Sequence, residues 1–130
     1  MTTSTSTAPA VGGAVRLLLR LEGLAALAAA IALYARCGFS WPTFAVLYLA
    51  PDLAMLGYLM NPRIGAAAYN VAHTYALALP LALLGFLAGL PAILTVALIW
   101  IAHIGFDRML GYGLKYPTRL RDTHLGRIGR

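Results

Sequence analysis

Two histidines and two aspartates stand out in this sequence because each lies within an apolar stretch. His103 and Asp107 are four residues apart, so on a helix they share one face. Asp52 directly follows a proline in a second apolar stretch, and His73 lies in a third. Imidazole and carboxylate groups could together bind zinc, iron or manganese, act as acid and base, or relay protons.

The composition indicates a membrane protein. Of the 130 residues 61% are hydrophobic and only 11% are charged, whereas soluble domains carry about 25% charged residues. So few charges cannot cover a globular surface, and we expect the chain to lie in a bilayer. Cys37 is the only cysteine, which excludes an intrachain disulfide and a cysteine metal cluster.

The hydrophobic pattern predicts an all-α, integral membrane four-helix bundle with up-down-up-down topology. Each apolar run is long enough to cross a hydrocarbon core of about 30 Å at about 1.5 Å per residue. Pro80 is expected to kink the third span. We expect a disordered tail over residues 1–15, spans at about 16–35, 42–60, 64–87 and 91–110, and a basic tail over 111–130.

The distribution of basic residues predicts the orientation. With a cytoplasmic N-terminus, nine of the ten lysines and arginines face the cytoplasm and only Arg36 faces the other side. We therefore expect both termini to be cytoplasmic. The bilayer itself, with anionic lipid headgroups at the basic tail, is the expected partner. Although the net charge is +6, the basic residues form no nucleic-acid-binding motif, so we expect no nucleic-acid binding.

The depth of the polar residues predicts that they meet. His73 would lie about 14 Å along its helix from the cytoplasmic end, and His103 about 10 Å. A charge buried in the bilayer costs roughly 2.5–3.5 kcal/mol on insertion scales, so such groups usually face inward and pair. We expect both histidines to converge, with Asp52 buried among the helices. The inferred polar layer consists of Glu22, Asp52, Asn70, His73, His103 and Asp107.

Simpler interpretations remain open for several of these residues. Glu22 could pair with a neighbouring arginine at the interface, and Asp107 could pair with Arg108. The histidines could be hydrogen-bonded packing residues. The glycine- and tyrosine-rich segment that begins at Gly111 suits an interfacial anchor. Alternatively, that segment folds back as a lid below the polar layer, with Lys115, Asp122 and His124.

Several segments of the chain are distinctive enough to compare with known proteins. They are Leu21-Glu-Gly23, Ala50-Pro-Asp-Leu-Ala-Met-Leu-Gly-Tyr58, Tyr69-Asn-Val-Ala-His-Thr-Tyr75, Ile101-Ala-His-Ile-Gly-Phe-Asp-Arg-Met-Leu-Gly-Tyr-Gly-Leu-Lys-Tyr116 and Asp122-Thr-His-Leu-Gly126. Together they resemble a family of bacterial, short, four-helix integral membrane proteins catalogued only as a domain of unknown function. The resemblance covers about Arg16 to Arg130. It implies a location in the bacterial inner (plasma) membrane, and it implies no activity and no catalytic residues.

Three classes of function therefore stay open. In the first, the chain is a membrane enzyme or metal protein, with Asp52, His73, His103 and Asp107 as the catalytic or metal-ligating candidates and a divalent transition metal as cofactor. In the second it is a small proton-coupled transporter. In the third it is a structural or accessory bundle whose polar layer only fixes packing. Self-association into a homo-oligomer is compatible with all three.

Overall fold

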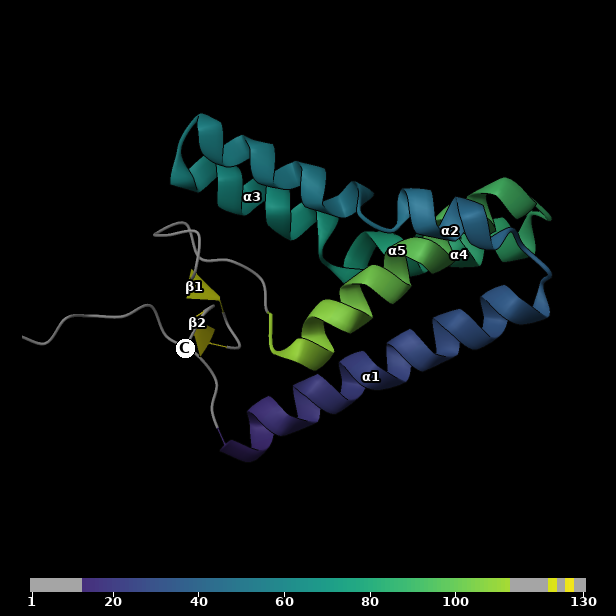
Figure 1. Ribbon diagram of the computed structural model, residues 1–130, viewed down its shortest axis with the longest axis horizontal. Coiled ribbons are helices and arrows are strands. Elements are labelled where there is room, and N and C mark those ends of the chain that lie inside the picture. Colours follow the sequence, from purple (N-terminus) through teal and green to yellow (C-terminus); the bar gives the residue numbers. More distant parts are fainter. Residues whose placement is uncertain (1–12, 113–121, 124–125, 128–130) are drawn as a thin grey trace, which may run out of the picture.

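The computed structural model describes residues 13–112, 122–123 and 126–127, and this part of the chain is almost entirely helical (Figure 1). This confirms the all-α class. Its elements are α1 (Gly13–Arg36), α2 (Trp41–Leu47), the 3-10 helix η1 (Ala50–Leu59), α3 (Pro62–Ala72), α4 (Tyr75–Leu87), α5 (Pro91–Leu110) and a short antiparallel pair of strands, β1 (Asp122–Thr123) and β2 (Gly126–Arg127).

Three helical segments of the described chain are long and apolar enough to cross a membrane. They are Gly13–Arg36, Pro62–Leu87 and Pro91–Leu110. Large apolar side chains such as Leu83 and Phe86 are exposed on them. Such exposed apolar faces are costly in water and are expected in lipid, so the fold is that of a membrane protein.

The helices α1 and α5 pack closely against each other and run in opposite directions (Figure 1). Glycines make this contact possible, because a Cβ atom on Gly105 would lie 2.7 Å from the carbonyl oxygen of Gly23. Small residues commonly allow such close helix contacts in membranes. The Arg20 side chain donates a hydrogen bond of 2.9 Å to the Met109 carbonyl, so the start of α1 and the end of α5 lie at the same end of the fold.

The segment predicted as the second span, residues 42–60, is not one continuous helix. It consists of α2 and η1, with a break at Tyr48 and Leu49. Pro51 lacks the N–H that would continue an α-helix, and the Asp52 N–H binds the Leu49 carbonyl three residues back at 3.0 Å. The chain therefore tightens into a 3-10 helix at the position where Pro51 was expected to make the second span irregular.

The third predicted span is also interrupted. The break lies at His73 and Thr74, whereas α4 contains Pro80, the residue at which we predicted a kink, in its interior. The Thr74 side chain accepts a hydrogen bond of 3.3 Å from the Ala76 N–H and so starts a new helix there. The break leaves His73 at the end of α3, where its side chain can turn toward α5.

The helices η1 and α3 form a hairpin that diverges from α1 (Figure 1). Close contact between them is again possible at glycines, because a Cβ atom on Gly57 would lie 3.1 Å from the Cα of Gly65. The end of α3 meets α5, where the Trp100 indole N–H donates to the Ala72 carbonyl. The functional candidates lie at this junction between the hairpin and α5.

Candidate functional site

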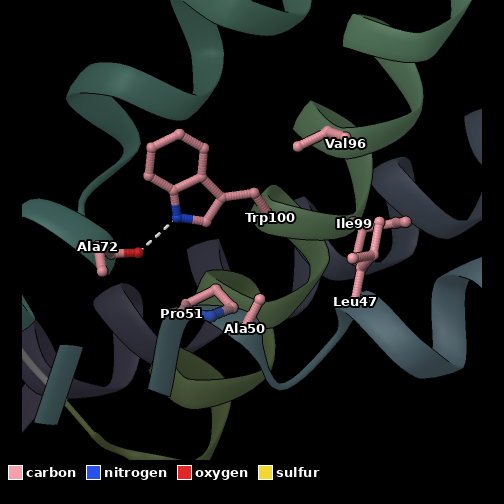
Figure 2. A pocket seen from close by; sticks show the side chains of 7 residues that line it. All are labelled: Leu47, Ala50, Pro51, Ala72, Val96, Ile99 and Trp100. Atoms are coloured by element: carbon pink, nitrogen blue, oxygen red, sulfur yellow. Dashed lines mark hydrogen bonds between the residues drawn. The ribbon is translucent and has the colours of Figure 1, made fainter. Parts of the chain in front are cut away.

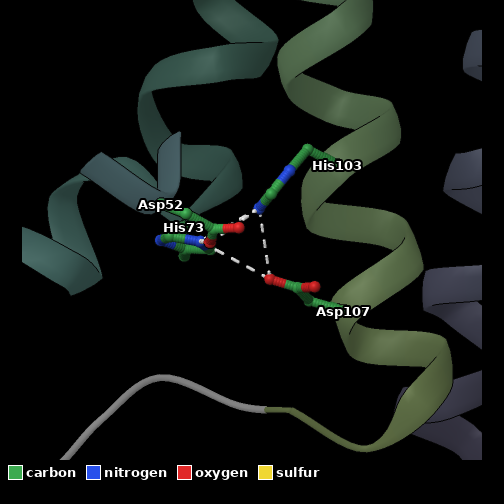
Figure 3. A group of neighbouring side chains, drawn as sticks. All are labelled: Asp52, His73, His103 and Asp107. Carbon is green, nitrogen blue, oxygen red and sulfur yellow. Dashed lines mark hydrogen bonds and ion pairs between the residues drawn. The ribbon is translucent and has the colours of Figure 1, made fainter. Parts of the chain in front are cut away.

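The four candidate residues converge on one point, between the hairpin and α5 (Figure 3). One nitrogen or oxygen atom from each of Asp52, His73, His103 and Asp107 lies within 4.8 Å of the other three. The two Nε2 atoms of the histidines are 3.2 Å apart, and the side chains of His73 and His103 are only 1% and 2% exposed. Helices from three separate parts of the sequence thus build one buried cluster.

Both histidine rings are held in place by backbone carbonyls. The Nδ1 atom of His73 lies 2.9 Å from the Tyr69 carbonyl oxygen, and the Nδ1 atom of His103 lies 2.5 Å from the Tyr48 carbonyl oxygen. A carbonyl can only accept a hydrogen bond, so each Nδ1 carries the proton. In the neutral ring, each Nε2 therefore presents a lone pair to the centre of the cluster.

The two carbonyls can accept these bonds because the backbone next to each of them forms hydrogen bonds three residues back and not four. The His73 N–H binds the Asn70 carbonyl three residues back, rather than the Tyr69 carbonyl four residues back. The Asp52 N–H similarly binds Leu49 rather than Tyr48. Each carbonyl is thus left for an imidazole. The two breaks in the predicted spans orient the two rings.

The carboxylates complete the cluster. One oxygen of Asp52 lies 3.1 Å from the Nε2 of His73 and 3.2 Å from that of His103. One oxygen of Asp107 lies 3.5 Å and 3.4 Å from the same two nitrogens. With neutral imidazoles and ionised carboxylates, all four atoms are acceptors, so a proton or a metal ion must lie between them. The proton could be on a ring nitrogen or on a carboxyl oxygen.

The distances fit a tetrahedral metal site. Ligand atoms about 2.0–2.1 Å from a tetrahedral zinc ion lie about 3.3–3.4 Å from one another. The five distances among Nε2 and carboxylate oxygens that involve a histidine are 3.1–3.5 Å. Metal-binding histidines also commonly donate their other ring N–H to a backbone carbonyl, as His73 and His103 do here.

The chain belongs to the family DUF4260, a domain of unknown function. The family model matches residues 16–128, which include all four residues of the cluster. This confirms the membership in a domain-of-unknown-function family that the sequence motifs predicted. No curated protein and no solved structure matches the chain.

In this DUF4260 member, Asp52 is more exposed than Asp107. Its side chain is 42% exposed, whereas that of Asp107 is 15% exposed. We expected Asp52 to lie among the helices with polar partners. It is partly buried, and its carboxylate contacts the Nε2 atoms of both histidines. It is therefore the accessible edge of a cluster that is otherwise closed.

Arg108 contributes to the site in a way that the sequence did not predict. It was considered only as a partner for Asp107, but it is buried and donates a hydrogen bond of 2.9 Å to the His73 carbonyl. It also donates to the Tyr112 carbonyl at 3.2 Å. A helix ends with unsatisfied carbonyls, and a buried guanidinium satisfies one of them here. The sequence feature that could have indicated this role is a basic residue next to Asp107 inside an apolar helix.

Tyr69 fixes the other side of the His73 ring. The two rings are stacked, with their centroids 3.7 Å apart and their planes 9° apart. Tyr69 lies four residues before His73, so helical spacing puts both on one face, but the stacking was not predicted. The stacking, the hydrogen bond from Nδ1 to the Tyr69 carbonyl and the Arg108 hydrogen bond to the His73 carbonyl together fix the orientation of the His73 imidazole.

Glu22 does not belong to the group of ligand atoms. Glu22 lies on the exposed side of α1, because the adjacent Gly23 is the residue that faces α5. Successive helix residues point about 100° apart, so both cannot face the same neighbour. Asn70 is partly buried in α3. Of the predicted lid, the described residues include Gly111, Tyr112 and the backbone of Asp122 in β1, whereas Lys115 and His124 lie outside them.

Proposed function

We propose that this chain is a small integral membrane metalloprotein that binds one divalent transition metal ion. The ligands are the Nε2 atoms of His73 and His103 and one carboxylate oxygen each of Asp52 and Asp107. The observation that carries the proposal is that four acceptor atoms lie within 4.8 Å of one another, with each Nε2 3.1–3.5 Å from the other three, while both Nδ1 protons are already bound. A divalent ion at the centre would satisfy all four at once.

Charge supports the same proposal. Two carboxylates and two neutral imidazoles carry a net charge of −2, of which the buried Arg108 beside them offsets at most one unit, and burying uncompensated charge is costly. A divalent ion brings the cluster to neutrality. The donor set contains nitrogen and oxygen but no thiolate, which suits zinc, iron and manganese.

The exposure of Asp52 suggests what the metal does. Because Asp52 is the accessible ligand, it is the one that water or a substrate could most readily replace. A metal with an exchangeable position can activate water or polarise a bound oxygen. Asp52, once displaced, would lie beside that position as an acid–base group. We therefore propose an acid–base metal site rather than a closed structural one.

The proposed orientation places this site in the cytoplasmic half of the plasma membrane. We place the α2–η1 segment as the second span. The chain then crosses the membrane four times, and both termini are cytoplasmic. The nine-to-one distribution of basic residues supports this. So does the contact of Arg20 with Met109, which brings the two ends of the described helical part together. Anionic headgroups would then surround the basic ends.

A second candidate function is proton relay, as in a small proton-coupled transporter. The same atoms that would bind a metal are also within hydrogen-bond distance, with Asp52 3.1 Å and 3.2 Å from the two Nε2 atoms. Protons on the imidazoles could replace the metal, and Asp52 would connect the cluster to the surface. Metal content separates this candidate from the first.

The deciding experiment measures metal in the purified protein. The chain is produced without a polyhistidine tag in medium containing zinc, iron and manganese, purified in mild detergent, and analysed by mass spectrometry. We expect about one metal ion per chain, and at least a tenfold weaker affinity in His103→Ala, since each ligand supplies a large share of binding. Glu22→Ala is the matched control because Glu22 lies outside the cluster, and it should retain the metal.

Two further measurements make the result decisive. Thermal unfolding in detergent establishes that His103→Ala remains folded, because removing one partner of a buried polar cluster can destabilise the fold. If the folded wild-type protein holds no metal and takes up none of the three ions, the metal proposal is wrong. Proton flux in liposomes, lost in Asp52→Asn, would then support the second candidate.

A further inference from the structure

An apolar cavity of about 250 Å³ lies at the same junction as the cluster (Figure 2). Figure 2 shows the Trp100 indole along one wall, with its N–H directed at the Ala72 carbonyl. That hydrogen bond satisfies both polar groups, so the wall offers hydrocarbon surface. The lining includes Ala50, Pro51, Ala72, Val96, Ile99 and Trp100.

Each of the three elements that line the cavity also carries a residue of the cluster nearby in the sequence. Pro51 directly precedes Asp52, and Ala72 directly precedes His73. Trp100 lies three residues before His103, which is about one helical turn. The apolar cavity therefore neighbours the polar cluster.

The position of the cavity along α5 identifies what surrounds it. Val96, Ile99 and Trp100 lie near the middle of the Pro91–Leu110 segment, which is long and apolar enough to span a membrane. The Val96 side chain is 45% exposed, so this side of the cavity is open. At that depth of a bilayer the surrounding medium is hydrocarbon chains.

We propose that this cavity binds one hydrocarbon chain of a membrane amphiphile, and that the oxygen-bearing head group of the same molecule reaches the metal at Asp52. The proposal rests on the metal site proposed above. The volume is slightly below the roughly 300–1,000 Å³ of pockets that enclose drug-sized ligands, so it suits a slender chain. The substrate or ligand class is therefore lipid-like.

The charge of the cluster determines when the head group can bind. Without a metal, the two carboxylates repel an anionic oxygen at this short distance. With a divalent ion the cluster is neutral, and the exposed position beside Asp52 can accept an oxygen ligand. Binding of a lipid with an anionic head group should therefore depend on the metal.

The test uses the two tryptophans of the chain as reporters. In a Trp41→Phe background, Trp100 is the only tryptophan and can be excited selectively over the tyrosines. The ligand 9,10-dibromostearate is titrated into the zinc-loaded protein in nanodiscs of unbrominated lipid. We expect saturable quenching of Trp100, because bromine quenches on contact. A Trp100→Phe background, with Trp41 alone, should show only the linear quenching that partition into the bilayer produces.

A pair of Ala→Phe variants tests the position. Ala50→Phe fills the cavity and should weaken saturable binding at least tenfold, as expected when a chain loses its pocket, while the zinc content stays unchanged. Ala82→Phe is the matched control, because Ala82 lines a different apolar cavity between α1, α4 and α5. It should bind dibromostearate as the wild type does.

The outcomes separate the two proposals. Zinc bound with linear quenching of Trp100, or with equal effects of the two Ala→Phe variants, overturns the lipid proposal and leaves the metal site standing. Quenching that is saturable but unchanged when a chelator removes the zinc overturns the role of the metal in binding the head group. A protein that binds no metal overturns the proposed function, and the head-group contact with it.

Discussion

The Nε2 atoms of His73 and His103 lie 3.2 Å apart, although the two residues are thirty positions apart in the chain. Each ring donates its Nδ1 proton to a backbone carbonyl. Two nitrogen lone pairs would repel at this distance, so the pair requires a cation or a shared proton between the rings. This relationship distinguishes the cluster from two ordinary packing histidines.

We expect the ligands to act as one unit. His103→Ala and Asp52→Ala should each lower metal affinity at least tenfold, and the double variant should lose less than the sum of the two effects, because ligands of one metal ion are not independent. Competition with a calibrated chelator measures the affinities. Full additivity would indicate two separate sites. Thermal unfolding of each variant controls for loss of fold.

Arg108 should matter for metal binding without being a ligand. It holds the His73 carbonyl at 2.9 Å, so Arg108→Met leaves that buried carbonyl unsatisfied at a cost of about 1–3 kcal/mol and loosens the His73 ring. We expect metal affinity to fall about 10- to 100-fold, the usual effect of removing a group that positions a ligand. Arg108→Lys should recover part of it, since lysine retains a donor. Unchanged affinity in Arg108→Met would exclude this role.

The two imidazoles should share one tautomer in the metal-free protein. The carbonyls of Tyr69 and Tyr48 accept from Nδ1, so the neutral rings should carry the proton on Nδ1 and leave Nε2 bare. Nitrogen-15 NMR of selectively labelled protein distinguishes the two tautomers by the shift of each nitrogen. Observation of the Nε2–H form would show that the carbonyls do not orient the rings.

The contact between α1 and α5 should not tolerate a side chain on Gly105. A Cβ atom there would lie 2.7 Å from the Gly23 carbonyl oxygen. Gly105→Ala should therefore force the helices apart and lower the free energy of unfolding by about 1–3 kcal/mol, as overpacking does. Ala29→Ser, on an exposed face of α1, is the control for the added atom. Equal stability of the two variants would refute the close contact.

The orientation in the membrane can be tested with reporters. A fluorescent protein fused after Arg130 should fluoresce in the cytoplasm, and a periplasmic phosphatase fused at the same position should be inactive. The reverse pattern should appear for a fusion in the loop after Arg36. A phosphatase active after Arg130 would invert the proposed topology.

Much of the site could be predicted because it depends on local properties of the chain. Hydrophobicity and helix length indicate the membrane class, and the four polar residues are conspicuous because charge in an apolar helix is costly. Counting residues along each span placed His73 and His103 at similar depth. Pro51 also marked the irregular helix near Asp52. These inferences need only composition, spacing and the rise of a helix.

Other features were decided only by the tertiary structure. Depth along a helix does not say which way a side chain points around it, and Glu22 points away because Gly23 takes the contact with α5. The break at His73, and the use of the Tyr48 and Tyr69 carbonyls, follow from hydrogen bonds that form only when the hairpin meets α5. An isolated, uniformly apolar helix could bury any of several faces at nearly the same free energy. Contacts with neighbouring helices therefore decide its rotation and the residues at which its hydrogen bonds end.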